Sequence, residues 1–507
     1  GAYLLLKLAF EQSFAAVSPH DINAHGHAQI FGWVGLFVMG FAYQAFPRFK
    51  HGALRRPRLA LATFPVYVTG LVLRTVSEAL HPTPAFLWTG LAGSALEIAA
   101  VSVFAWIVAR TLLVPEPRPA STDRYILAAT SWFVVQAVYD AFLFAMTYTA
   151  PTTEELVARI ATFQVPLRDM QIHGFALLMI LGVSQRYLPG MIGLGRVPDR
   201  LADRALWVIN LAVAGEIVGF LGRRASSSLV FPLLLEASVL ALGAACAVLV
   251  WKLGVLHLPA ERDRSVKFLR AAYAWLLISL VLLALFPVYL SFTGVRFSHA
   301  YFGATRHAIT VGFVSLMIVG VASKVVPTLN GVPASTLPGL WAPFVLINAG
   351  CVMRVLFQIL TDASELAFPV AGVSGCLEVA GLCLWGIHIL RIMAGRYRVA
   401  VETKASCGAP EEASPDHVVG WLTEAVPETI EVFDRMGFTA IKNRLLRETV
   451  ARSITIRQAC KLKGIDEAKL IAALNEALEA SRKAREAGRP APEAPVEFVG
   501  RLSRAAR

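Results

Sequence analysis

The chain has 507 residues, of which 56% are hydrophobic and 16% are charged, and its formal net charge is +12. Apolar runs of about 20 residues recur along it, which is the length that an α-helix needs to cross a bilayer. A soluble fold has too little interior for so much apolar surface, so the sequence predicts an all-α polytopic membrane protein. The net positive charge does not indicate a nucleic-acid partner, because it is concentrated in the loops on one side of the predicted helices.

Eleven apolar runs are long enough to span a membrane, and a shorter apolar segment precedes them at residues 2–17. The runs lie near residues 27–47, 58–80, 84–113, 124–149, 168–189, 201–221, 228–257, 268–290, 301–327, 339–361 and 366–393. Because the leading segment is short and the chain begins with Gly rather than Met, we expect the first of about twelve helices to be incomplete. No cleavable signal peptide is evident.

The Lys and Arg residues are distributed unevenly between the two sides of the predicted helices. Six alternate loops hold 22 of them: 48–58, 110–124, 186–204, 252–270, 324–338 and 391–404. The opposite loops hold six, at Arg159, Arg168, Arg223, Arg224, Arg296 and Arg306. Basic residues accumulate on the cytoplasmic side of a membrane protein. We therefore expect the histidine-bearing helix ends described below to be periplasmic and the C-terminal tail to be cytoplasmic.

Three segments of equal length align without a gap, at 27–47, 169–189 and 307–327. They read HAQIFGWVGLFVMGFAYQAFP, DMQIHGFALLMILGVSQRYLP and HAITVGFVSLMIVGVASKVVP. A second helix supports the same period, because SALEIAA, LLLEASV and GCLEVAG place Glu97, Glu236 and Glu378 at nearly the same spacing. The repeat predicts three pseudo-symmetric units of four helices, approximately residues 1–113, 124–257 and 265–393, within a membrane domain of residues 1–395.

The first and fifth positions of the aligned segment share one helix face. They hold His27 and Phe31 in the first unit, Asp169 and His173 in the second, and His307 and Val311 in the third. Imidazole is the commonest metal ligand in proteins, so this face predicts a haem or metal site. His27 and His307 are the expected haem ligands, and His173 with Asp169 is expected at a second metal position.

Two further histidines lie close to this face in the sequence. His25 precedes His27 by two residues and points off the face in a regular helix, and His299 precedes the helix of His307 within GVRFSHAYFGATRH. Both are additional candidates for cofactor binding. A single histidine at a helix start is more often an interfacial residue than a ligand, whereas three histidines on one repeated face favour ligation.

The segment ATRHAITVGFVSLMIVGVASK, residues 304–324, resembles the NnrS family, and HAQIFGWVGLFVMGFAYQAFP resembles that family's histidine-bearing second helix. The similarity covers roughly residues 1–395. A histidine-headed, glycine-punctuated helix recurring every four helices also resembles subunit I of haem-copper oxidases and nitric oxide reductases. The resemblance implies a bacterial inner-membrane protein that binds haem b, with copper as a second metal, and acts in nitric oxide, nitrosative-stress or respiratory metabolism.

The sequence departs from the oxidases where those enzymes build their copper site. The oxidases carry a His-His pair on the seventh helix and His-x-His on the tenth, whereas LADRALWVINLAVAGEIVGFLG has no histidine and the tenth helix has only His307. The sequence therefore argues against oxygen reduction with proton pumping. His173 matches the position of one copper ligand in those enzymes, and Asp169, His299 or His25 would be its partners. No CxxCH motif is present, so quinol or another subunit would supply electrons.

Several ionisable residues fall within the predicted spans, where a lone charge is costly. Glu97, Glu236, Glu378 and the mid-span Asp140 are candidates for a proton relay. Arg74 and Arg354 occupy matching places and are candidate partners of Glu97 and Glu378. The alternative to a proton path is that these groups form interhelical bonds retained from an ancestral repeat.

After residue 395 the hydropathy falls. Residues 396–416 are predicted to be a linker, 417–480 a small soluble helical domain and 481–507 a disordered tail. The domain resembles the small helical domain that opens the di-iron proteins of iron-sulfur cluster repair. It contains no evident catalytic group, so it is expected to bind a partner.

Three functions remain open from the sequence. The first is a membrane haem or haem-copper protein that binds, senses or converts nitric oxide or a related small oxidant. The second is a haem-free, proton-coupled transporter that uses Glu97, Glu236, Glu378 and Asp140. The third is a membrane scaffold or subunit of a redox complex. The expected partners are membrane lipid, a small gaseous ligand, and quinol or redox subunits, with no nucleic acid.

Overall fold

The computed structural model describes residues 1–50, 52–113, 119–257, 263–332, 337–397, 410–443, 446–447, 451 and 454–486. These residues form helices and connecting turns, with no strand among them and a single isolated antiparallel bridge between Val418 and Thr455. Most of the predicted linker and tail lies outside the described residues. Contacts divide the chain into two compact units, residues 1–322 with 340–386 and residues 323–339 with 387–507.

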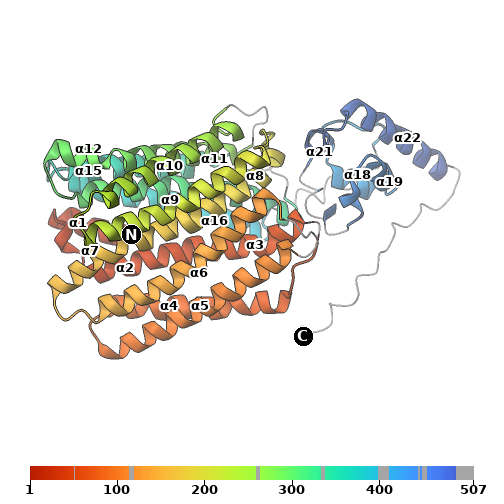
Figure 1. Cartoon of the computed structure of the whole chain (residues 1–507). Helices are drawn as coiled ribbons and strands as arrows, with labels where there is room; N and C mark the ends of the chain where they lie inside the picture. The colour runs from red at the N-terminus through yellow and green to blue at the C-terminus, as the bar shows by residue number, and fades with distance from the viewer. Residues whose placement is uncertain are drawn as a thin grey trace. The chain divides into compact units, whose positions relative to one another are not determined.

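Ten helices in the described part of the chain are long and apolar enough to cross a membrane. They are Pro19–Phe49, Pro57–Ala79 (α4), Pro84–Leu113 (α5), Ser121–Tyr148 (α6), Asp199–Ala225 (α9), Val230–Leu253 (α10), Val266–Ala284 (α11), His299–Leu329, Trp341–Leu360 (α15) and Ala367–Met393 (α16). They confirm a polytopic all-α membrane protein. Figure 1 shows the long helices of the first unit lying side by side as a bundle.

The count of ten is smaller than the twelve predicted, for two reasons. The N-terminal helix α1, Ala2–Glu11, has 10 residues and is therefore only about 15 Å long. The fifth predicted span belongs to a continuous helix from Thr153 to Ile192, formed by α7 (Thr153–Asp169), η3 (Met170–Leu177) and α8 (Leu178–Ile192). This helix is not among the ten, and its first part, TEELVARIATFQVPLRD, is polar.

The three aligned segments share an irregular backbone. Each contains a π-helix of eight residues, at Ala28–Gly35 (η2), Met170–Leu177 (η3) and Ala308–Ser315 (η4). Each π-helix begins at the second position of its aligned segment, so the backbone follows the register of the sequence repeat. Such segments are rare and often lie at functional sites. Like η3 between α7 and α8, the other two interrupt longer helices, η2 between α2 (Pro19–His27) and α3 (Leu36–Phe49), and η4 between α13 (His299–His307) and α14 (Leu316–Leu329).

Side chains fix the π-helices against their neighbours. The Tyr67 hydroxyl donates to the Phe31 carbonyl at 2.9 Å, and the Trp33 indole of η2 donates to Ser315 Oγ of η4 at 3.1 Å. Two tryptophans pack in equivalent ways, because Trp132 covers Gly174 and Trp275 covers Gly312. Each indole also donates to an asparagine, Trp132 to Asn210 of α9 and Trp275 to Asn348 of α15. The second and third units therefore share the same local packing.

Glycines bring the last two helices of each unit close together. A Cβ at Gly70 would lie 2.7 Å from the Gly93 carbonyl oxygen, and one at Gly350 would lie 2.8 Å from the Ser374 carbonyl oxygen. In the second unit a Cβ at Gly219 would lie 2.8 Å from the Leu235 nitrogen. Small residues at such contacts let membrane helices pack backbone to backbone. The exact boundaries of the three units stay predictions.

The C-terminal part of the chain forms a small helical fold with its own core. Its helices are α18 (Val419–Ala425), α19 (Thr429–Arg435), α21 (Ile456–Lys463) and α22 (Glu467–Glu486), with a 3₁₀ turn at Thr439–Lys442. Leu422, Phe433 and Leu470 are fully buried in this core. Burial lowers the pKa of His417, and its Nδ1 accepts a hydrogen bond from the Ser414 amide. A small helical C-terminal part is therefore observed as predicted, whereas its bounds, its solubility and its partner-binding role stay predictions.

The glycine packing predicts a difference between two alanine substitutions. A Cβ at Gly312 would lie 2.5 Å from Trp275 Cγ, whereas a Cβ at Gly40 would meet no atom within 4 Å. We expect Gly312→Ala to destabilise the protein by about 1–3 kcal/mol, as overpacking does. Gly40→Ala should be neutral or slightly stabilising, because alanine favours helix. Thermal unfolding in detergent measures both, and equal melting temperatures would contradict the packing described.

Candidate functional site

His27 is enclosed by two carboxylates from other helices. Its Nε2 lies 3.0 Å from Glu97 Oε1 on α5, and its Nδ1 lies 3.1 Å from Asp140 Oδ2 on α6. The residue is 1% exposed, and its ring stacks on Phe31 at a centroid distance of 4.4 Å. Both ring nitrogens donate only in the imidazolium form, so with a neutral ring one of the carboxyl groups must hold a proton.

The His27 site continues into a chain of buried ionisable groups. Asp140 Oδ2 also lies 3.5 Å from an Arg74 guanidinium nitrogen, and Arg74 bonds Glu78 at 2.8 Å, one turn further along α4. Glu78 Oε1 in turn lies 2.6 Å from His20 Nδ1. The His20 ring stacks on His81 at 3.8 Å between centroids. Six buried residues are thus connected in a row, and we call them the histidine–carboxylate chain: His20, Glu78, Arg74, Asp140, His27 and Glu97.

This arrangement differs from the ion pairs expected from sequence. Among the described residues, Arg74 forms ion pairs with Glu78 and Asp140, whereas Glu97 pairs with His27. The sequence analysis missed His20 and Glu78. One signal was present, because Glu78 follows Arg74 by four residues and such pairs meet on a helix surface. The relay roles predicted for Asp140 and Glu97 stay predictions.

The second unit gathers a different set of groups. His173 Nδ1, in η3, lies 2.9 Å from Glu216 Oε2 on α9, and Asp169 closes the group from the end of α7. One ligand atom from each of the three residues can be chosen so that all lie within 4.8 Å of one another. The expected proximity of Asp169 and His173 is therefore observed, and Glu216 is an addition that the sequence analysis missed.

Glu236 does not occupy the place that the sequence repeat predicts. A Cβ at Gly70 or Gly350 would contact the side chain of Glu97 or Glu378, whereas a Cβ at Gly215 would contact Ser238. Glu97 and Glu378 are buried, at 2% and 8% exposed. Glu236 itself is only partly buried. Its relay role stays a prediction, but it is not the structural counterpart of Glu97 and Glu378.

His307, in the third unit, differs from His27 and His173 in its contacts with carboxylates. His307 Nε2 lies 3.8 Å from Glu378 Oε2, which is too long for a hydrogen bond. In the described part of the chain no hydrogen bond to the ring of His25 or His307 is formed. His307 interacts electrostatically with both His25 and Arg354, so these three groups share one region. Arg354 Nε and Glu378 Oε1 are buried and have no hydrogen-bond partner among the described residues.

His299 lies apart from these groups along its helix. It begins α13 and is exposed, and its ring contacts Phe297 edge-on at 4.9 Å. Eight residues separate it from His307, which is about 12 Å along a helix. His299 is therefore less well placed than His25 to act together with His307, and its predicted ligand role stays a prediction.

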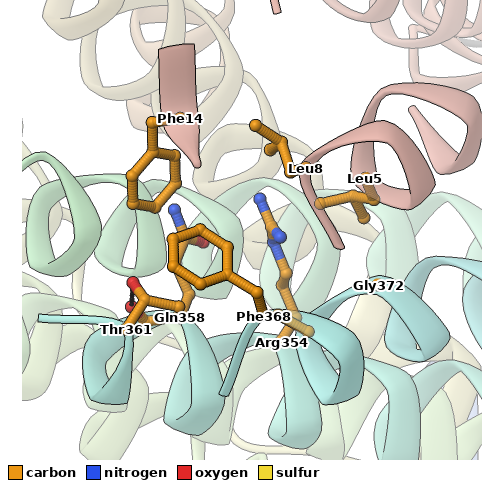
Figure 2. Close-up of a pocket in the computed structure, with 9 residues that line it drawn as sticks. Leu5, Leu8, Phe14, Arg354, Gln358, Thr361, Phe368 and Gly372 are labelled. Atoms are coloured by element: carbon orange, nitrogen blue, oxygen red, sulfur yellow. Dashed lines mark hydrogen bonds between the residues drawn. The ribbon is translucent and has the colours of Figure 1, made fainter. Parts of the chain in front are cut away.

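A small pocket beside Arg354 lies between α1, α15 and α16. Figure 2 shows Arg354 and Gln358 pointing from α15 toward α1, where Leu5 and Leu8 face them, with Phe368 nearby. Its volume of ≈ 10 Å³ admits about one water molecule. The pocket is therefore far too small for a porphyrin.

The donor atoms give a test of whether a haem fits this chain. A haem iron needs a free imidazole nitrogen, and both nitrogens of His27 already face carboxylates. His25 and His307 offer unengaged ring nitrogens, with an arginine beside them that suits a propionate. The residues present therefore fit haem ligation at His25 and His307 better than at His27. The assignment of His27 stays a prediction.

The network also predicts the effect of removing a buried charge. Arg74→Met leaves Glu78 and Asp140 without their cation, and breaking a buried ion pair costs about 3–5 kcal/mol. We expect a large loss of thermal stability and of folded yield in detergent.

Arg124→Met provides the matched control for this prediction. Arg124 bonds Asp203 at 2.6 Å, but its side chain is 42% exposed. Exposed pairs contribute about 1 kcal/mol or less. If the two variants melted at the same temperature, the buried chain would not carry the stability assigned to it.

Comparison with known proteins now identifies the family. Residues 2–396 match the family model described as NnrS protein, and residues 414–471 match a domain of unknown function, DUF1858. No curated protein matches the chain. The first match covers more than half of the chain, so the chain belongs to the NnrS family.

Proposed function

We propose that this member of the NnrS family is a haem-binding membrane protein that binds, senses or converts nitric oxide or a related small oxidant. Membership of the family supports a membrane haem or metal protein linked to the nitric oxide response at the level of the family. The further proposal is that the chain lies in a bacterial inner membrane with its histidine-bearing helix ends in the periplasm. Membrane lipid, a gaseous ligand, and quinol or a redox subunit are the proposed partners.

The single observation that carries the haem proposal is the pair of unengaged imidazoles, His25 and His307. They come from the two π-interrupted helices Pro19–Phe49 and His299–Leu329, and Arg354 lies in the same region. Two neutral imidazoles would be able to hold a b-type haem. Arg354 would hold a propionate, because its guanidinium recognises carboxylates well. A haem held there would supply redox-active iron.

The first experiment separates the two candidate ligand pairs. We expect purified wild-type protein to show a low-spin b-type spectrum in the reduced-minus-oxidised difference. His307→Ala and His25→Ala should each lose that spectrum, because each removes an axial nitrogen. His27→Ala should keep it, since both His27 nitrogens face carboxylates in the structure.

Pyridine haemochrome quantification and the size-exclusion profile serve as the controls for content and folding. Loss of haem in His27→Ala and His307→Ala, with retention in His25→Ala, would restore the pair expected from the repeat. Absence of haem from cofactor-replete wild type would overturn the haem proposal. Copper analysis of the same samples tests the second cofactor expected from the family resemblance.

The histidine–carboxylate chain favours a second candidate function, proton-coupled transport. Five contacts between 2.6 and 3.5 Å connect His20 to Glu97 through buried groups on four stretches of helix. Chains of buried acids and histidines are typical of proton relays in membrane proteins. Glu236 and Glu378, proposed for the same role from sequence, are not part of this chain.

Proteoliposomes with a pH-sensitive dye inside test the second candidate. An imposed potassium gradient with valinomycin should drive proton entry through wild type, and Glu78→Gln should slow it at least about tenfold by removing one proton carrier. Glu236→Gln is the matched control and should behave like wild type. Proton entry no faster than in empty vesicles would exclude this function.

A further inference from the structure

We propose that Asp169, His173 and Glu216 bind a divalent first-row metal ion of the iron(II), manganese(II) or zinc(II) class. This site is separate from the His25 and His307 pair, and the proposal does not depend on haem. It combines one imidazole with two carboxylates, and no thiolate or thioether contributes. Mixed oxygen and nitrogen ligands of this kind suit these ions better than they suit copper(I), which prefers sulfur.

The spacing of the ligand atoms supports this inference. First-row ions bind such ligands at about 2.0–2.2 Å, so two ligands of one ion are at most about 4.4 Å apart. The three ligand atoms here lie within 4.8 Å of one another, and one pair is 2.9 Å apart. Side-chain shifts of a fraction of an ångström would bring all three ligand atoms within bonding distance of one ion.

Burial and charge give a second argument. His173 is 5% exposed and Glu216 is 2% exposed, and the Asp169 carboxylate makes no hydrogen bond among the described residues. Two carboxylates thus converge on one imidazole in a largely dry interior, where their mutual repulsion is strong. Arg306, on α13, interacts electrostatically with Asp169 and supplies one compensating charge. A divalent cation would more than offset the negative charge that remains, and it would bond all three groups.

The internal repeat shows that this group is specific to the second unit. In the first and third units an acid on the last helix, Glu97 or Glu378, lies within 4 Å of the repeated histidine, at 3.0 Å and 3.8 Å. In the second unit the acid that reaches the histidine is Glu216, on the preceding helix α9. The position occupied by His27 and His307 is Asp169 here. Both departures from the repeat add carboxylate oxygen around one histidine.

Metal analysis of the full chain tests the site. Detergent-purified protein would be stripped with a chelator, incubated anaerobically with Fe²⁺, Mn²⁺ or Zn²⁺ and desalted, and metal per protein would be measured by mass spectrometry. We expect about one equivalent of non-haem metal in wild type. Glu216→Gln and Asp169→Asn should weaken binding at least about tenfold. Electron paramagnetic resonance of added Mn²⁺ gives the affinity without reference to activity.

Three controls keep the result interpretable. Glu236→Gln removes a partly buried carboxylate of the same unit and should bind metal like wild type. His307→Ala should also keep the metal, even where it loses haem, so failure of the haem proposal and failure of this one are distinguishable. Size-exclusion profiles report folding, and Asp169→Asn replaces Glu216→Gln if the latter misfolds. Wild type that binds no more metal than Glu216→Gln, or that takes up only copper, would overturn the proposal.

Discussion

The cost of placing a charge inside an apolar helix bundle governs the interior of this protein. A lone buried carboxylate or guanidinium is strongly destabilising, whereas a group that faces an opposite charge and a hydrogen-bond donor is tolerated. The histidine–carboxylate chain meets that condition from one end to the other. Because Glu97, Asp140 and Arg74 lie on three helices, the position of each of these helices is tied to the other two. The glycine contacts hold α4 and α5 close together, so that Arg74 and Glu97 lie in the same buried region.

The sequence was sufficient to predict the polytopic all-α membrane architecture and the proximity of Asp169 and His173. Long apolar runs decide between membrane and soluble folds almost by length alone, and a threefold repeat that aligns without a gap over a whole helix fixes its own register. Asp169 and His173 were predicted together because they lie one turn apart on a single helix. The polar α7 and the short α1 lowered the number of clear spans, since hydropathy reports composition rather than helical continuity.

Contacts between helices were harder to predict, because sequence similarity and packing equivalence differ locally. LLLEASV aligns with SALEIAA through its glutamate, yet Gly215 packs on Ser238 and not on Glu236. Glu236 is only partly buried, whereas Glu97 and Glu378 are buried. Glu216 then reaches His173 from another helix. No periodicity within α9 indicates which of its neighbours an acid will meet.

The repeat position did not predict which groups surround its histidines. His27 and His307 occupy the same position before a π-helix, yet one has both nitrogens facing carboxylates and the other has neither within hydrogen-bond distance. The difference arises on the neighbouring helices, where Asp140 closes the site around His27. A duplicated backbone thus presents the same point of the helix three times, and the residues that surround that point decide its chemistry. This is why three copies of one fold unit can support a hydrogen-bonded chain, a carboxylate-rich group and a pair of free imidazoles in a single bundle.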